Sequence, residues 1–316
     1  MKNLTEGITM ELKIDENHKL FARLISKSPE WWKNLIADPE IYIEIRKNNY
    51  INVYCNGGSL MKLEGSDSFK AEIHVKYIPL RGKGDYLGFC FKENDISFQK
   101  IAPLSLNNFA DESLSELKKR IKKYYPNKSE KGLQGRYIIH NNNKVSSNGF
   151  FIDSEFQFSL EGSTKGRIDL VWVDLIEKKI IFVELKTMGD ERLYSEGKQN
   201  PESIDVQLKK YHNFAEKNAP ILINYYDKIF RIKNKLGILP SFVTETSLAD
   251  YELCSKPILL IGDCSQDWID SNVTNDKNPN NLNQKIQDIA HSAIYQGKTT
   301  FNFNIPKKTQ GNIFLF

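Results

Sequence analysis

Apolar side chains recur at every second position over several short stretches in the first hundred residues. The strand-like stretches are 41–46, 50–54, 60–64 and 71–80. A period of two is that of a half-buried β-strand, and the Asn48-Asn49 and Gly57-Gly58 pairs between stretches are typical turn sequences. Residues 16–37 instead show helical spacing in two pieces. The pattern therefore predicts a small antiparallel meander with one or two helices.

The pattern changes to a helical period over 111–125, with Leu114, Leu117 and Ile121 on one face. The opposite face is basic and carries Lys118, Lys119, Arg120, Lys122 and Lys123. Pro126 ends this helix, and a second helix is expected over 129–139. Beyond it we predict strands over 150–158, 166–175, 178–186, 256–263 and 312–316, helices over 201–217, 220–236 and 284–295, and an exposed Asn-rich loop over 271–284.

Strands that alternate with helices after residue 110 predict an α/β fold, whereas the part before that residue is rich in strands only. A chain of 316 residues is long enough for two such parts. We therefore predict a β-rich N-terminal domain over 1–110 and an α/β domain with a C-terminal extension over 111–316. No Gly/Ser-rich or Pro-rich linker marks the boundary between them.

Two of the predicted strands gather two acids and a lysine. The segment GRIDLVWVDLIEKKIIFVELKT consists of two strands joined by a short turn. If Asp174 pairs with Lys179, then Asp169 lies opposite Glu184, and such cross-strand partners have Cβ atoms about 4.5–5.5 Å apart. Lys186 projects to the same face because side chains alternate along a strand. Sequence spacing alone thus places the three side chains on one surface.

This trio has the chemistry that metal-assisted phosphodiester hydrolysis requires. Two adjacent carboxylates repel each other unless a cation lies between them. Mg²⁺ prefers oxygen ligands, so Asp169, Glu184 and the backbone carbonyl of Leu185 would suffice to hold it, with Mn²⁺ as a substitute. Lys186 would orient or deprotonate the attacking water, or neutralise charge in the transition state. The alternative is an acid–lysine pair on a solvated sheet face, but Glu184 follows the apolar run IIFV, where a charge is seldom found without a partner.

Asp169 on one strand, followed by Glu184-Leu185-Lys186 on the next, resembles the PD-(D/E)XK nuclease superfamily and in particular its RecB-like members. The usual proline before the aspartate is replaced by Ile168, and the downstream Gln-x-x-x-Tyr motif is matched by Gln207 and Tyr211. The resemblance covers roughly residues 128–215. It implies a restriction-endonuclease-like mixed central sheet flanked by helices, with Asp169 and Glu184 as metal ligands and Gln207 as a catalytic positioning group.

The resemblance also implies a further acidic residue ahead of Asp169. Glu155 and Glu130 are both candidates, and we prefer Glu155 because it lies on the strand expected beside that of Asp169. Gln207 and Tyr211 share one helical face, so both side chains would point into the site, although Tyr211 also fits a core position. Contacts to nucleic acid are expected from Tyr211 and from the basic helix face, through Lys118, Lys119, Lys122 and Lys123. A solvated face is the alternative for these lysines.

Composition and the absence of other motifs narrow the classes further. A net charge of +4 permits a polyanionic partner without requiring one. The four cysteines and five histidines show no zinc or redox spacing, and no phosphate-binding GxxxxGK[ST] loop occurs. No apolar run has the length of a transmembrane helix and none follows the N-terminus as in a signal peptide, so a cytoplasmic protein without membrane contact is expected.

Two functions from different classes follow from these observations. The first is a Mg²⁺-dependent nuclease, with DNA favoured over RNA by the resemblance alone and a place in restriction or anti-phage defence suggested only by analogy of fold. The N-terminal domain would then serve for recognition, for docking a partner protein or for forming a homodimer. The second is a non-catalytic module that binds nucleic acid or a protein on the same fold. The nuclease is favoured because Asp169, Glu184 and Lys186 are all present.

Overall fold

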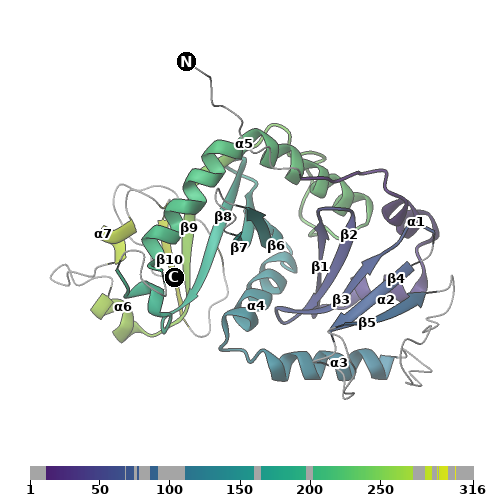
Figure 1. The fold of residues 1–316 in the computed structure, drawn as a ribbon, viewed down its shortest axis with the longest axis horizontal. Helices are drawn as coiled ribbons and strands as arrows, with labels where there is room; N and C mark the ends of the chain where they lie inside the picture. Colours follow the sequence, from purple (N-terminus) through teal and green to yellow (C-terminus); the bar gives the residue numbers. More distant parts are fainter. Residues whose placement is uncertain are drawn as a thin grey trace.

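The computed structural model describes residues 12–67, 69–74, 77, 86–91, 111–159, 165–196, 202–272, 282–286, 290, 292–297 and 303. Within these ranges the strands form two sheets of five strands each, and helices cover both sheets (Figure 1). The protein therefore belongs to the mixed α/β class, as its sequence predicts. None of the helices in the described ranges combines the length and the apolar character needed to cross a membrane.

The first sheet is an antiparallel meander in which each strand pairs with the next one along the chain. Its strands are β1 (Ile41–Arg46), β2 (Tyr50–Cys55), β3 (Gly58–Glu64), β4 (Phe69–His74) and β5 (Tyr86–Phe91). Asn48 and Asn49 form the first turn with φ of 67° and 61°, a region that asparagine adopts more readily than most residues. The helices α1 (Lys19–Lys27) and α2 (Glu30–Ala37) precede the sheet, so the predicted meander and its two helices are confirmed.

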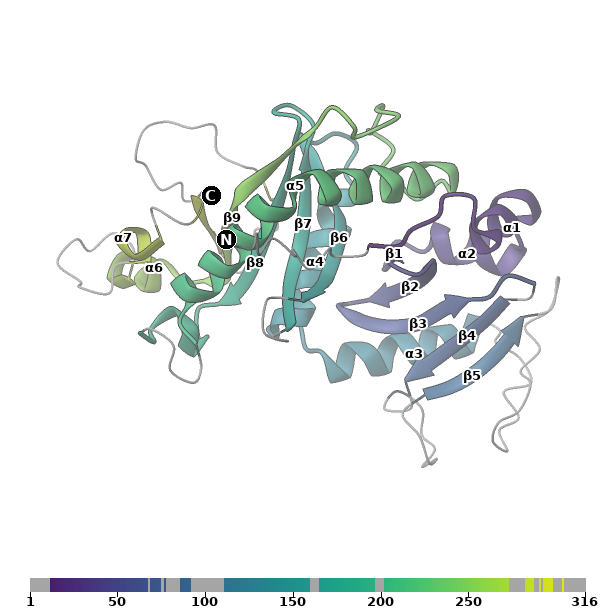
Figure 2. The ribbon, with the colours of Figure 1, turned by 45° about the horizontal axis from the view of Figure 1, so that its top comes forward.

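The second sheet is mixed, with the order β10-β9-β8-β7-β6. Its antiparallel part comprises β6 (Gly149–Ser159), β7 (Lys165–Asp174) and β8 (Lys179–Thr187), and its parallel part adds β9 (Glu252–Cys264) and β10 (Ser292–Gly297). The helix α4 (Glu130–Asn142) precedes β6, and α5 (Ile204–Lys235) connects β8 to β9, as Figure 2 shows. Shorter helical segments are η2 (Glu191–Leu193), α6 (Gln266–Asn272) and α7 (Leu282–Ile286).

Alternation along the strands divides the second sheet between two helices. On β8, Ile181, Val183 and Leu185 pack in one core cluster with Leu133 and Tyr137 of α4. Ile180 and Phe182, which point the other way, pack in another cluster with side chains of α5. The sheet is thus covered by α4 on one face and by α5 on the other. Glu184 and Lys186, in register with Ile180 and Phe182, belong to the α5 face.

Some predicted elements differ from those observed. Residues 201–217 and 220–236 were expected as two helices, yet α5 is continuous and contains Pro220. An internal proline costs about 3 kcal/mol, but Pro220 is exposed and the buried stripe continues past it through Leu222 and Tyr226. The helix expected over 284–295 ends at Ile286, and 292–297 is instead the edge strand β10.

Other predictions fall on residues that are not described. The final strand over 312–316 and most of the Asn-rich loop lie outside the described residues. The boundary near residue 110 does too, and the division into two domains there remains a prediction. The helix α3 (Asp111–Tyr124), which the sequence assigns to the second domain, packs against β2 and β3 of the first sheet.

The turn between β2 and β3 packs directly on α4. Gly57 in this turn has a φ of 78°, and a Cβ at this position would overlap the backbone carbonyl of Lys131. On the helix side, a Cβ at Gly135 would overlap the backbone of Asn56 and Gly57. Only glycine permits this approach of turn and helix. The first sheet therefore fixes the position of the helix that begins at Glu130.

Candidate active site

The hairpin of β7 and β8 has the predicted register. Pairing runs from Asp174 opposite Lys179 to Leu170 opposite Val183. One residue beyond, the carboxylate of Asp169 accepts a hydrogen bond from the backbone N–H of Leu185, with Oδ2 at 3.0 Å. Asp169 is thereby held beside the Glu184-Leu185-Lys186 segment, where the sequence places it.

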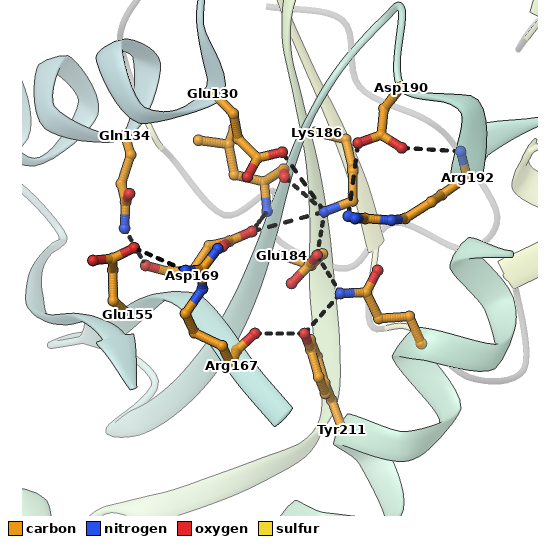
Figure 3. Close-up of polar contacts among 12 residues, drawn as sticks. Glu130, Gln134, Glu155, Arg167, Asp169, Glu184, Lys186, Asp190, Arg192 and Tyr211 are labelled. Carbon is orange, nitrogen blue, oxygen red and sulfur yellow. Dashed lines mark hydrogen bonds and ion pairs between the residues drawn. The ribbon is translucent and has the colours of Figure 1, made fainter. Parts of the chain in front are cut away.

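Lys186 lies at the centre of the site, with its ammonium among three carboxylates (Figure 3). Nζ forms an ion pair with Glu184, lies 3.8 Å from Oδ2 of Asp169 and lies 3.9 Å from Oε2 of Glu130. It also donates a hydrogen bond to the carbonyl of Leu185 at 3.0 Å. Lys186 and Glu184 are each only 1% exposed.

The carboxylates are crowded and poorly solvated. Burial and then the charge of Asp169 raise the pKa of Glu184 to about 8, although Lys186 opposes both effects. Burial and then the charge of Asp169 also raise the pKa of Glu130. Burial disfavours the charged form of Lys186, but the carboxylates outweigh it, so the net change in the pKa of Lys186 is upward. Two of the three carboxyl groups around Lys186 therefore hold a proton more tightly than they would in water.

Gln207 and Tyr211 of α5 support Glu184 from the helix side. Nε2 of Gln207 donates to Oε1 of Glu184 at 2.6 Å and to the hydroxyl of Tyr211 at 2.8 Å. The Tyr211 hydroxyl in turn donates to the carbonyl of Arg167 at 2.6 Å. Tyr211 is only 3% exposed and offers little surface to a ligand, and the nucleic-acid contact expected of it stays a prediction. Its place one helical turn from Gln207 makes it a residue that positions Gln207.

Of the two candidate acids, Glu130 is the one that shares Lys186 with Asp169 and Glu184. It is the first residue of α4, whose N-cap Ser129 accepts a hydrogen bond from the backbone N–H of Gly132 at 3.1 Å. Glu155, the residue preferred from the sequence, forms ion pairs with Lys131 and Arg167 instead. The preference for Glu155 considered neighbouring strands only, whereas the N-terminus of α4 brings Glu130 to Lys186 from outside the sheet.

Gln134 and Lys131 belong to the site and were not anticipated. Nε2 of Gln134 donates to the backbone carbonyl of Asp169 at 2.6 Å, and Nζ of Lys131 donates to Oε1 of Gln134 at 3.3 Å. Gln134 lies four residues after Glu130 and therefore on the same face of α4. This spacing was the available signal, and it becomes meaningful only once Glu130 is known to face the site.

The basic face of α3 is partly used within the protein. Lys118 forms ion pairs with Asp38 and Glu40 at 2.6 Å and 2.8 Å, and Lys122 pairs with Glu40. Their charges already have carboxylate partners. Lys119 and Lys123 are exposed on the same helix, so the predicted nucleic-acid contact suits these two better.

The residues of the site fit a divalent cation in their donor chemistry. Glu184, Asp169 and Glu130 supply carboxylate oxygens, the hard ligands that Mg²⁺ prefers. Oε2 of Glu184 is buried and has no hydrogen-bond partner among the described residues. The described residues do not contain a group of three His, Cys, Asp or Glu side chains already spaced as a coordination shell. In this arrangement the Lys186 ammonium is the cation toward which the carboxylates converge.

Comparisons with protein-family models, with curated proteins and with solved structures find no match to this chain. The functional assignment therefore depends on the geometry of the site itself.

Proposed function

We propose that this protein is a Mg²⁺-dependent nuclease that hydrolyses phosphodiester bonds, with DNA as the expected substrate. The observation that carries the proposal is the convergence of Asp169, Glu184 and Glu130 on Lys186 in a buried site. Charged groups are rarely buried in such number without a function. The mixed sheet with a helix on each face agrees with what the sequence resemblance implies.

Asp169 and Glu184 would hold the metal, together with the carbonyl of Leu185 and with Glu130 as a further acid. A bound Mg²⁺ would polarise a phosphoryl oxygen and lower the pKa of a water molecule. The Lys186 ammonium is placed to donate hydrogen bonds to phosphate oxygens as negative charge develops on them. Gln207, fixed by Tyr211, would hold the Glu184 carboxylate in one orientation.

The direct test is cleavage of fluorescently labelled duplex DNA, single-stranded DNA and RNA of one sequence, with Mg²⁺, Mn²⁺ or EDTA. We expect cleavage of at least one substrate with metal and none with EDTA. Asp169→Asn and Glu184→Gln, which keep shape and remove charge, should each lower the rate by about a hundredfold or more while circular dichroism stays unchanged. Binding without cleavage under every condition would instead support the non-catalytic module, and cleavage by either variant at the wild-type rate would exclude this site.

Metal binding has a second signature that does not depend on finding the substrate. A cation that binds only the folded protein stabilises it by about 2.7 kcal/mol when its concentration is a hundred times Kd. We therefore expect Mg²⁺ to raise the Tm of the wild type and to leave that of an Asp169→Asn/Glu184→Gln double variant unchanged. Equal shifts in both proteins would place the metal elsewhere.

A further inference from the structure

Lys131 and Arg167 form a pair of cations at the edge of the acidic site. Lys131 follows Glu130 on α4, whereas Arg167 lies on β7, two residues before Asp169. Both contact the same carboxylate, that of Glu155: Lys131 through an ion pair, and Arg167 with Nη1 at 3.5 Å from Oε1. The side chain of Arg167 is 47% exposed and that of Lys131 is 19% exposed, so the pair is open to solvent on one side.

These two cations are built into the framework of the site. Lys131 donates to Gln134, which donates to the backbone carbonyl of Asp169. The backbone carbonyl of Arg167 accepts the hydroxyl of Tyr211, which holds Gln207. Arg167 and Asp169 are only two residues apart along β7. The basic pair therefore lies beside the carboxylates at a position fixed by the same hydrogen bonds.

Glu155 is held in an unusual backbone conformation between the two cations. It lies in β6, between the pairs Ser154–Leu170 and Phe156–Ile168, and its φ is +55°. A left-handed conformation inside a strand is costly for a residue other than glycine, and such strain is concentrated at functional positions. The single carboxylate of Glu155 forms ion pairs with both cations, so it does not neutralise either charge fully. These features are expected of a counter-ion that can be displaced by an anion that binds the two cations more strongly.

We propose that Lys131 and Arg167 form a phosphate clamp that binds the substrate backbone beside the acidic cluster, with Glu155 as the counter-ion that the phosphate displaces. This inference rests on the proposed nuclease function and specifies how that site holds its substrate. The chemical class of the ligand is a phosphodiester. Arginine binds a phosphate through the parallel N–H donors of its planar guanidinium, whereas lysine acts as a point charge. The two contacts are therefore complementary.

The test is equilibrium binding of fluorescein-labelled duplex DNA, single-stranded DNA and RNA by anisotropy, in EDTA so that no cleavage occurs, at several salt concentrations. Lys131→Ala and Arg167→Ala should each raise Kd about tenfold and lower the salt-dependence slope by about one. Glu155→Gln should lower Kd, a gain that misfolding cannot produce. Lys33→Ala is the matched control, since Lys33 is also an ion-paired helical lysine, with Glu30 at 3.4 Å, but lies on α2. Its Kd should equal that of the wild type.

Each contrary result has a distinct meaning. If the wild type binds and cleaves nucleic acid, but Lys131→Ala and Arg167→Ala bind as it does or Glu155→Gln binds more weakly, the clamp is wrong and the nuclease proposal stands. If the wild type binds no nucleic acid, inorganic phosphate is the probe, with chloride at equal ionic strength as the control. A rise in Tm with phosphate in the wild type, and none in a Lys131→Ala/Arg167→Ala double variant, would support the clamp without the nuclease. No rise in the wild type would exclude both.

Discussion

Lys186 lies almost entirely inside the protein, between carboxylates from two strands and one helix. A lysine at 1% exposure is stable in its charged form only because Glu184, Asp169 and Glu130 compensate for the lost water. The ammonium in turn stabilises the three carboxylates, which would otherwise repel one another. The same four groups thus stabilise one another and form the chemical centre of the site.

The first prediction concerns Lys186→Ala. If the ammonium acts on the reacting phosphate, kcat should fall about a hundredfold or more while substrate affinity changes little. Lys186→Arg should rescue poorly, because a planar guanidinium cannot replace a compact ammonium in a buried space. Lys119→Ala, on the exposed face of α3, should show the opposite pattern of weaker binding with kcat unchanged. Single-turnover kinetics at two salt concentrations separate the two, and a Lys186→Ala variant that behaves like Lys119→Ala would remove Lys186 from the catalytic group.

At the level of single residues, the sequence predicts contacts that follow from local spacing. Asp169, Glu184 and Lys186 were placed correctly because a short hairpin fixes its own register. Gln207 and Tyr211 lie where helical spacing puts them, but the burial of Tyr211 depends on the sheet beneath α5. The location of Glu130 depends on how α4 approaches the sheet, which no local pattern encodes.

The helix α4 is the element that completes the site from outside the sheet. It carries Glu130, Lys131 and Gln134 within its first five residues, so a small displacement of this helix would move all three. Its position is set on one side by the second sheet and on the other by the turn at Gly57. The N-terminal sheet therefore contributes to the site through packing.

The second prediction is that Gly135→Ala lowers both stability and activity. Intrinsic helix propensity favours alanine by up to about 1 kcal/mol, but a Cβ here would lie 2.7 Å from the backbone carbon of Asn56. Backbone atoms yield less than flexible side chains, so α4 must shift, at a cost of about 1–3 kcal/mol. Gly189→Ala is the control, because a Cβ there would have open space. Urea denaturation and cleavage rates measure the effect, and a Gly135→Ala variant more stable than the wild type would show that the turn does not constrain the helix.

At the level of elements, the sequence predicts those whose pattern is strong and short in range. The alternation over β1 to β4 and β6 to β8 suffices to predict strands. Two helices are expected over 201–217 and 220–236 because a local pattern does not report the burial that keeps α5 continuous past Pro220. The strand β10 was missed because it forms by pairing with β9, which is distant in the sequence. Local patterns do not report such pairing.

Four buried charged residues join the two sheets on the α5 side of the molecule. Glu44 and Arg46 come from β1, Asp153 from β6 and Lys233 from α5. Arg46 forms an ion pair with Asp153, and Lys233 lies 2.7 Å from Oε2 of Glu44 and donates to the carbonyl of Ile152 at 2.6 Å. Isolated charges would not be stable here, so each depends on a partner from the other part of the chain. These pairs make the relative position of the two sheets specific.

The last prediction follows from the titration of Glu44. Burial, together with the charge of Asp153, raises the pKa of Glu44 to about 7 against the opposing effects of Lys233 and Arg46. Because the folded-state pKa lies above that of an unfolded glutamate, near 4.5, the folded protein holds the proton more tightly. Its contribution to stability is therefore complete below pH 4.5 and is lost as the pH rises through 7. Glu44→Gln cannot titrate, so the stability of the wild type relative to this variant should fall by more than about 1 kcal/mol between pH 4.5 and pH 8. Urea denaturation of both proteins across this range measures the difference, and a difference that is constant or grows with pH would show that Glu44 is ionised in the folded protein throughout.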